Sequence, residues 1–195
     1  MDILAAWIQA LMWVSLHVTA LSLAQPDNQD SSIIFNRDHI YKHLIMRLNF
    51  TSYDLHCKTE ALNPHLSNHN VMMLVSEDNT SDHPYSYTRV LGIFHANLIY
   101  TGPGSIDYLP WHIEFLWVWW FDLDWSARWE NSTLDKGSFL PMHQPHAFGF
   151  VDPSDVLRCC HLIPSFVDGR LHSNVTSLSR EITDRDVWRS YYVNR

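Results

Sequence analysis

The chain has 195 residues, a formal net charge of −8 at pH 7 and a hydrophobic content of 46%. This length is enough for one domain with a hydrophobic core, and the apolar content argues against a disordered chain. The negative charge argues against unaided binding to a phosphate backbone, because such binding needs clustered Lys and Arg. We therefore expect a protein partner rather than a nucleic acid, and no small-molecule substrate is evident.

Residues 1–24 are expected to form a signal-like apolar leader, which carries no charge after Asp2. Ser22 and Ala24 stand three and one positions before Gln25, where signal peptidase prefers small residues. The leader lacks an initial Lys or Arg, so an uncleaved membrane anchor and a fortuitous apolar segment are the alternatives. A working leader makes the protein secreted, which the sequence favours. Otherwise we expect an intracellular or nuclear protein.

Residues 25–82 are expected to be an N-terminal extension of mixed helix and strand, with a domain boundary near Asp82. Strands are predicted over 46–53 and 71–75, where β-branched, aromatic and other apolar residues gather. Within residues 33–51, an apolar stripe at helical spacing predicts a helix that overlaps the first of these strands. The residues of this stripe are Ile40, Leu44, Ile45 and Leu48.

A β-rich domain is expected over 83–195, with its compact part at 83–170. Residues 85–100 predict a long strand, because the apolar side chains of Val90, Phe94, Ala96, Leu98 and Tyr100 share one parity. The turn sequence TGPGS then leads to a partner strand over 111–121.

An aromatic run within the second strand, FLWVWWF (115–121), lies between charged neighbours. It is too short to cross a membrane and rich in strand-favouring residues, so it predicts a strand buried on both faces. Its three tryptophans have two interpretations: a surface that stacks on ligands or cages methyl-lysine, or part of the core or of a partner interface. These tryptophans are Trp117, Trp119 and Trp120.

Residues 148–164 predict strand, short helix and strand in turn. Asp152 is expected to cap a helix that begins at Pro153 and ends near Arg158, with Val156 and Leu157 packed inward. The segment HLIP (161–164) then returns as a strand that Pro164 ends. The elements together predict a mainly β (β-rich α+β) fold. We expect a small curled sheet or an SH3/BAH-like partly open barrel with one or two short helices.

Four segments resemble an uncharacterised fungal protein family that is associated with Plavaka- and KDZ-type transposon-encoded proteins. They read RLNFTSYDLHCKTEALNPHLSNHNVMML (47–74), HPYSYTRVLGIFHANLIYTGPG (83–104), FLWVWWFD (115–122) and FGFVDPSDVLRCCHLIPSFVDGR (148–170). The resemblance covers roughly residues 35–193. It implies that the chain corresponds to the β-rich segment that follows the transposase core in those proteins. That segment has no assigned activity.

The chain departs from the family pattern at two positions: Trp119 stands where the pattern expects Arg, and Cys159 where it expects Gly. It also lacks the upstream transposase core. These departures favour a truncated or decayed copy.

Residues with metal-binding chemistry are present but poorly patterned. His143, His146 and His161 are weak candidates for a zinc site with the neighbouring cysteines, since no Cys-x-x-Cys motif exists. The carboxylates Asp122, Asp124 and Glu130 and the histidines His39 and His43 are expected to be solvated surface groups. We expect no metal, no cofactor and no catalytic residues.

Cysteines and sequons bear on the compartment. The three cysteines, Cys57, Cys159 and Cys160, do not form the even set of a small disulfide-rich secreted domain. Four N-glycosylation sequons are more than chance predicts, and they favour a secreted chain. Their acceptor residues are Asn49, Asn79, Asn131 and Asn174. The function that the sequence predicts is a non-enzymatic interaction or structural module, and the alternative is a secreted N-glycosylated protein.

Overall fold

The structure is a computed structural model that describes residues 33–51, 57–66, 69–74, 83–101, 109–124, 134–171 and 187–194. The chain divides into two compact units. The first comprises 1–43 and 94–115, and the second comprises 44–93 and 116–195. The leader 1–24 and the expected boundary at Asp82 lie outside the described residues, so both stay predictions. No helix among the described residues has the length and hydropathy needed to cross a bilayer.

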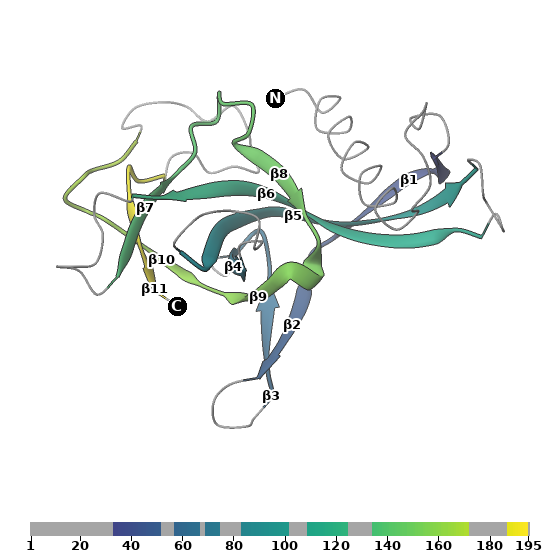
Figure 1. Cartoon of the computed structure of the whole chain (residues 1–195), viewed down its shortest axis with the longest axis horizontal. Coiled ribbons are helices and arrows are strands. Elements are labelled where there is room, and N and C mark those ends of the chain that lie inside the picture. The colour runs from purple at the N-terminus through teal and green to yellow at the C-terminus, as the bar shows by residue number, and fades with distance from the viewer. Residues whose placement is uncertain are drawn as a thin grey trace. The chain divides into compact units, whose positions relative to one another are not determined.

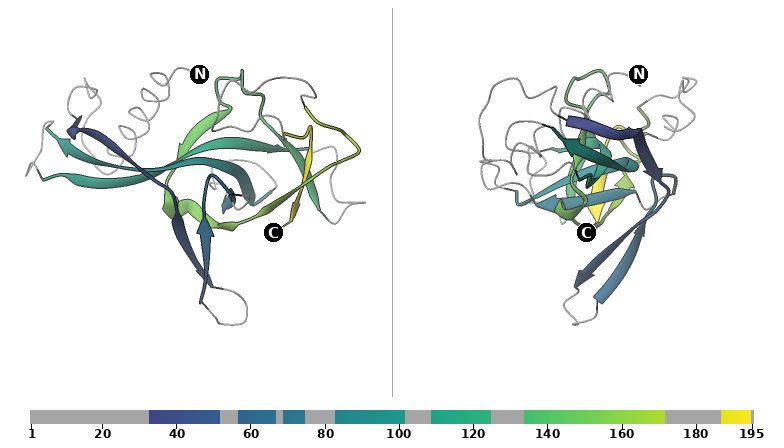
Figure 2. Two further views of the ribbon diagram at one scale, coloured as in Figure 1. Left: turned by 180° about the vertical axis from the view of Figure 1, so that it is seen from behind. Right: turned by 90° about the vertical axis from the view of Figure 1, so that its right-hand side faces the viewer.

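The fold is mostly β, as the sequence predicts. The strands are β1 (Ile33–His43), β2 (Met46–Thr51), β3 (Cys57–Leu62), β4 (Asn70–Leu74), β5 (Tyr85–Tyr100), β6 (Trp111–Leu123), β7 (Asp135–Phe139), β8 (Phe148–Val151), β9 (Val156–Cys159), β10 (His161–Pro164) and β11 (Tyr191–Asn194). The main sheet has the order β10-β11-β7-β6-β5-β4-β9 (Figure 1), with β1 paired to β5 and β8 paired to β6. Strands β2 and β3 form a separate antiparallel hairpin (Figure 2).

The two ends of this strand order are consecutive in the sequence. Strand β9 ends at Cys159 and β10 begins at His161, so only Cys160 separates the two edges of the sheet. The Cys160 N–H donates to the Asn70 carbonyl over 2.9 Å and so extends the β4–β9 pairing to the edge. The sheet is therefore curled and nearly closed, and it forms a partly open barrel. The predicted fold class is confirmed.

The aromatic strand β6 is buried on both faces in the second unit, as its apolar run predicts. Leu116 and Val118 are fully buried in one hydrophobic cluster, together with Val71 and Val90. Trp119 alternates with them and joins a second, aromatic-rich cluster. Since successive side chains of a strand point to opposite faces, one strand supplies both clusters.

The helix expected from the stripe at residues 40–48 is wrong. Residues 33–43 form strand β1 and residues 46–51 form strand β2. Leu44 and Ile45 are exposed, whereas Leu48 is buried, so the apolar residues do not share one face. The stripe spans only two helical turns, and pairing of β1 with β5 overrides so short a pattern.

The predicted N-cap at Asp152 is confirmed, but the helix that it begins is shorter than expected. The Asp152 carboxylate accepts a hydrogen bond from the Ser154 N–H over 2.8 Å. The helix is a single 3-10 turn, η3 (Pro153–Asp155), and Val156 already belongs to β9. Antiparallel pairing of β9 with β4 satisfies these backbone groups in place of further helical turns. Strand β10 over 161–164 agrees with the prediction.

Replacing Asp152 by alanine should lower the free energy of unfolding by about 1 kcal/mol, because the first turn loses its cap. Leu162 is half-buried and packs against the aromatic-rich cluster, so Leu162→Ala should cost about 2 kcal/mol. His143 is exposed, and His143→Ala should change stability by less than about 0.5 kcal/mol. Urea unfolding followed by circular dichroism measures all three. A larger loss for His143→Ala than for Leu162→Ala would contradict this order.

Candidate functional site

Trp119 belongs to the interior of the second unit. Its side chain is 1% exposed, and its ring stacks on Phe139 with centroids 4.6 Å apart. The indole N–H donates to the Leu140 carbonyl over 2.7 Å. Trp119 is therefore a core residue, the second of the two interpretations that the sequence left open, and it adds no exposed apolar surface.

Trp117 and Trp120 are half-buried rather than exposed on an open platform. The Trp117 ring lies 6.0 Å from that of Phe148 on β8. The Trp120 indole packs so closely over Gly149 that a Cβ added there would lie 2.6 Å from its Nε1. Residues of β8 thus cover part of each of these two tryptophans.

A cation of the protein itself, Arg89, lies among the aromatic rings. Its guanidinium carbon is 4.2 Å from the Phe139 ring centroid and 5.9 Å from that of Trp119. Its Nε–H donates to the Asn70 Oδ1 over 3.2 Å. Burial lowers the pKa of Arg89, whereas Tyr191 raises it. The arrangement has the chemistry of a methyl-lysine cage, but an internal arginine takes the place of the ligand.

Arg89 is a residue that the sequence analysis did not single out. Its position in the sequence could have identified it, because Arg89 is the only Lys or Arg within the largely apolar predicted strand 85–100. A charged residue at such a position is rarely buried without partners.

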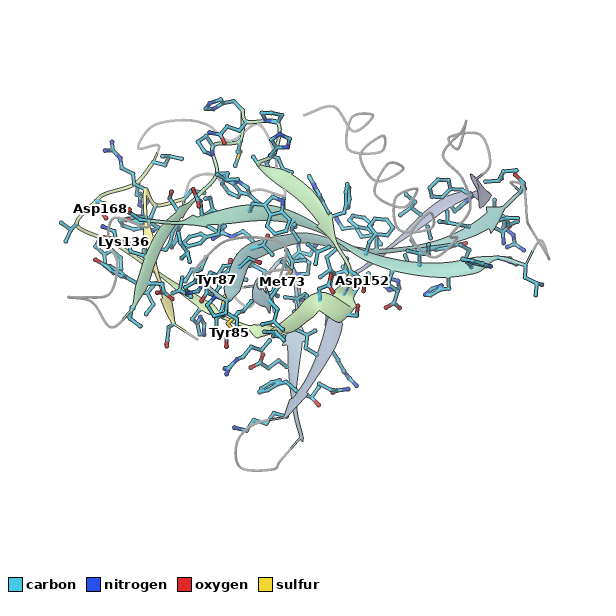
Figure 3. All side chains as sticks on the ribbon, viewed as in Figure 1. Met73, Tyr85, Tyr87, Lys136, Asp152 and Asp168 are labelled. Atoms are coloured by element: carbon cyan, nitrogen blue, oxygen red, sulfur yellow. The ribbon has the colours of Figure 1, made fainter. Side chains whose placement is uncertain are left out.

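A polar pocket of about 610 Å³ lies at the ends of β6 and β7, lined in part by Asp122, Asp124, Lys136 and Asp168. Lys136 and Asp168 lie next to each other (Figure 3), with the Lys136 Nζ 2.8 Å from the Asp168 Oδ2. This hydrogen bond, with others from Ser165 and Ser190, holds the pKa of Asp168 well below its usual value. The same bond raises the pKa of Lys136.

The polar pocket is poorly suited to acid–base catalysis. A general acid or base works best when its pKa lies near the ambient pH. The pKa of Lys136 is raised and the pKa of Asp168 is lowered, so both values move away from neutral pH. Both side chains therefore stay ionised, as an ion pair. Asp122 and Asp124 are exposed, as expected, and Glu130 lies outside the described residues.

A second pocket, of about 360 Å³, is lined by Glu60, Arg158, Cys159, Cys160 and His161 among others. The Cys159 N–H donates to the Glu60 Oε2 over 2.9 Å. Burial, with a smaller contribution from Glu60, raises the pKa of the Cys159 thiol to about 11. Burial and the neighbouring Cys159 raise that of Cys160 to about 12. Both cysteines are free in the structure and stay protonated at neutral pH, which makes them weak nucleophiles and metal ligands.

Cys159 and Cys160 should therefore resist alkylation by iodoacetamide in the folded protein. A rise in pKa from 9.0 to about 11 lowers the thiolate fraction of Cys159 about a hundredfold at pH 7.5. Mass spectrometry of labelled peptides should show slow modification of both cysteines in buffer and rapid modification in urea. Equal rates in the two conditions would mean that the pocket does not hold the thiols protonated.

The histidines proposed for zinc are exposed: His143 and His146 in the loop after β7, and His161 at the start of β10. Within the described ranges, no group of three or more His, Cys, Asp or Glu side chains is arranged to hold a metal ion. Among the glycosylation candidates, Asn49 lies in β2 with an exposed side chain. The other three, Asn79, Asn131 and Asn174, lie outside the described residues.

Comparison with known proteins gives no relative: no protein-family model matches the sequence, and no curated protein or solved structure is significantly similar to the chain.

Proposed function

We propose that the chain is a non-enzymatic interaction or structural module of a transposon-associated protein. The resemblance of residues 47–74, 83–104, 115–122 and 148–170 to the Plavaka- and KDZ-associated family supports the transposon link. The chemistry of the two pockets supports a non-enzymatic role, since the ion pair in one and the protonated thiols in the other leave little reactivity at neutral pH.

An exposed apolar turn carries the interaction proposal. We use the name apolar turn for Ile163, Phe166, Val167 and Leu171, whose exposed fractions are 40%, 70%, 97% and 45%. The four residues are close in sequence, and exposed apolar side chains that form a patch mark interaction sites on soluble proteins. The apolar turn therefore offers a protein partner a surface that the isolated chain leaves in water.

The apolar turn is also fixed in shape. The Asp168 N–H donates to the Ser165 carbonyl over 3.2 Å. The Phe166 ring packs edge-on against Trp188, with centroids 5.0 Å apart. The backbone of residues 169–171 is hydrogen-bonded to that of residues 187–189. A surface ordered before binding loses less conformational entropy when it binds, which favours affinity.

Cross-linking in cells, followed by mass spectrometry, tests this proposal. Wild type should cross-link to a defined protein partner, and the double variant Phe166→Ser/Val167→Ser should reduce that product at least about tenfold, which corresponds to about 1.4 kcal/mol. Leu66→Ser is the matched control, because Leu66 is a similarly exposed leucine (62%) outside the apolar turn. A partner set that both variants leave unchanged would contradict the proposal.

A secreted N-glycosylated protein is the second candidate function, and the position of Asn49 favours it. Its side chain is exposed, and its Oδ1 accepts a hydrogen bond from the Thr59 hydroxyl over 3.0 Å. Expression in a eukaryotic host should give exported protein that begins at Gln25. Glycosidase should shift its mobility, and Asn49→Gln should remove one glycan. Unglycosylated protein retained in the cell with its leader would contradict secretion.

A further inference from the structure

Three histidines from three neighbouring strands lie side by side in the first unit. His43 ends β1, His95 lies in β5 and His112 in β6, and these strands run next to one another (Figure 1). The ring centroids of His43 and His95 are 4.8 Å apart, and those of His95 and His112 are 4.5 Å apart. We name these three residues the histidine row.

The groups around the histidine row come from the same strands. Tyr41 of β1 stacks on His95, with centroids 4.6 Å apart and an interplanar angle of 11°. On β6, the Glu114 Oε1 lies 3.4 Å from the His112 Nε2. His39 of β1 lies further out, with its ring 6.2 Å from that of Tyr41. Glu114 is thus the carboxylate next to the row.

The contact between His43 and His95 limits how many protons the row can hold. The His43 Nε2 and the His95 Nδ1 are 2.5 Å apart. A hydrogen bond between two imidazole nitrogens needs one N–H and one lone pair, so only one of these two facing nitrogens is protonated. A second proton at this contact would place two N–H groups against each other and remove the acceptor. This hydrogen bond can therefore form when the histidines are neutral, but it cannot form when all three are protonated.

The end of β1 lies outside the buried core. None of the β1 side chains that the structure describes is buried. Arg37 has a φ of 63°, a conformation that costs a non-glycine residue roughly 1–2 kcal/mol. The His39 Nδ1–H donates to the Arg37 carbonyl and stabilises this kink. Beyond the kink, β1 pairs with β5, and Tyr41 and His43 contact His95.

We propose that the histidine row is a pH-dependent latch, which holds the end of β1 on β5 at neutral pH and releases it in mild acid. Partial desolvation, followed by the nearby His112 and His43, lowers the pKa of His95 from 6.5, and Glu114 only partly opposes the shift. When β1 is released, His95 loses its contact with His43 and part of its desolvation, so its pKa rises and it binds a proton more readily. Above about pH 6.5 both states are neutral, and below it the released state is favoured. This latch does not depend on the proposed function, since it involves other residues.

Hydrogen exchange of the full chain between pH 5 and 7.5 tests the latch. After correction for the intrinsic exchange rate, exchange in peptides that cover residues 38–43 should rise up to about tenfold per pH unit below pH 6.5, as uptake of one proton requires. His95→Phe keeps a ring against Tyr41 but cannot titrate at position 95, so its corrected exchange should depend on pH clearly less than that of wild type. His161→Gln removes an exposed histidine of β10 and should behave as wild type.

The proposal would be overturned if the corrected exchange of residues 38–43 in wild type did not change with pH. It would also be overturned if this exchange rose as steeply in His95→Phe as in wild type. If His95→Phe does not fold, His43→Gln replaces it, because its amide N–H can still donate to the His95 Nδ1 while the charge at position 43 is gone. The pH dependence of this variant should be weaker than that of wild type, and an unchanged dependence would equally overturn the latch.

Discussion

Replacing Trp119 by alanine should lower the free energy of unfolding by about 3–5 kcal/mol. The side chain is 1% exposed and stacks on Phe139 and Phe148. Its removal leaves a cavity in the aromatic-rich cluster, takes a ring away from Arg89 and leaves the Leu140 carbonyl without its indole donor. Urea unfolding followed by far-ultraviolet circular dichroism measures the change.

Trp111 provides the control for this substitution. It lies on the same strand, but 42% of its side chain is exposed, so Trp111→Ala should cost less than about 1 kcal/mol. Similar losses for Trp111→Ala and Trp119→Ala would mean that Trp119 is not part of the core.

Gly137→Ala should destabilise the protein by about 3 kcal/mol, since it overfills a closed site. Gly137 pairs with Leu123 where β7 joins β6. A Cβ added there would lie 2.3 Å from the Asp122 carbonyl oxygen and 2.5 Å from the Phe121 ring. The backbone oxygen cannot move away without breaking the pairing of the two strands. Thermal unfolding should therefore show a clearly lower melting temperature than wild type.

Gly169→Ala is the matched control for this substitution. Gly169 has a φ of +76° with no atom within 4 Å of an added Cβ, so alanine there meets conformational strain alone, about 1 kcal/mol. A Gly137→Ala variant that is as stable as Gly169→Ala would contradict the close approach of β7 to β6.

The strand elements with the strongest local patterns were predictable from the sequence. The aromatic run of β6 has no polar position between its charged ends, and it is buried on both faces. The cap at Asp152 was also predictable, because its partner is only two residues away. The length of the helix after the cap was not predictable, because pairing between strands that are distant in sequence decides it, as between residues 71 and 159. The sequence around Asp152 carries no sign of that pairing.

The candidate sites were less predictable, because register between distant strands assembles them. Arg89 meets Phe139 only because β5 and β7 both flank β6. His43 and His95 are 52 residues apart in sequence and in contact in the structure. Sequence reasoning noted His43 with His39 as surface groups and did not connect it to β5. Spacing within one segment cannot reveal partners that a sheet brings together.

The position of β11 has a consequence for how the chain folds as it leaves the ribosome. β11 is the last strand of the described chain, yet it lies between β10 and β7. Until residues 191–194 emerge, the backbone N–H and C=O groups that β7 and β10 offer to β11 have no strand to pair with. Such edges can recruit strands of other nascent chains. Deleting residues 191–194 would therefore leave both edges unpaired and should produce an aggregating protein.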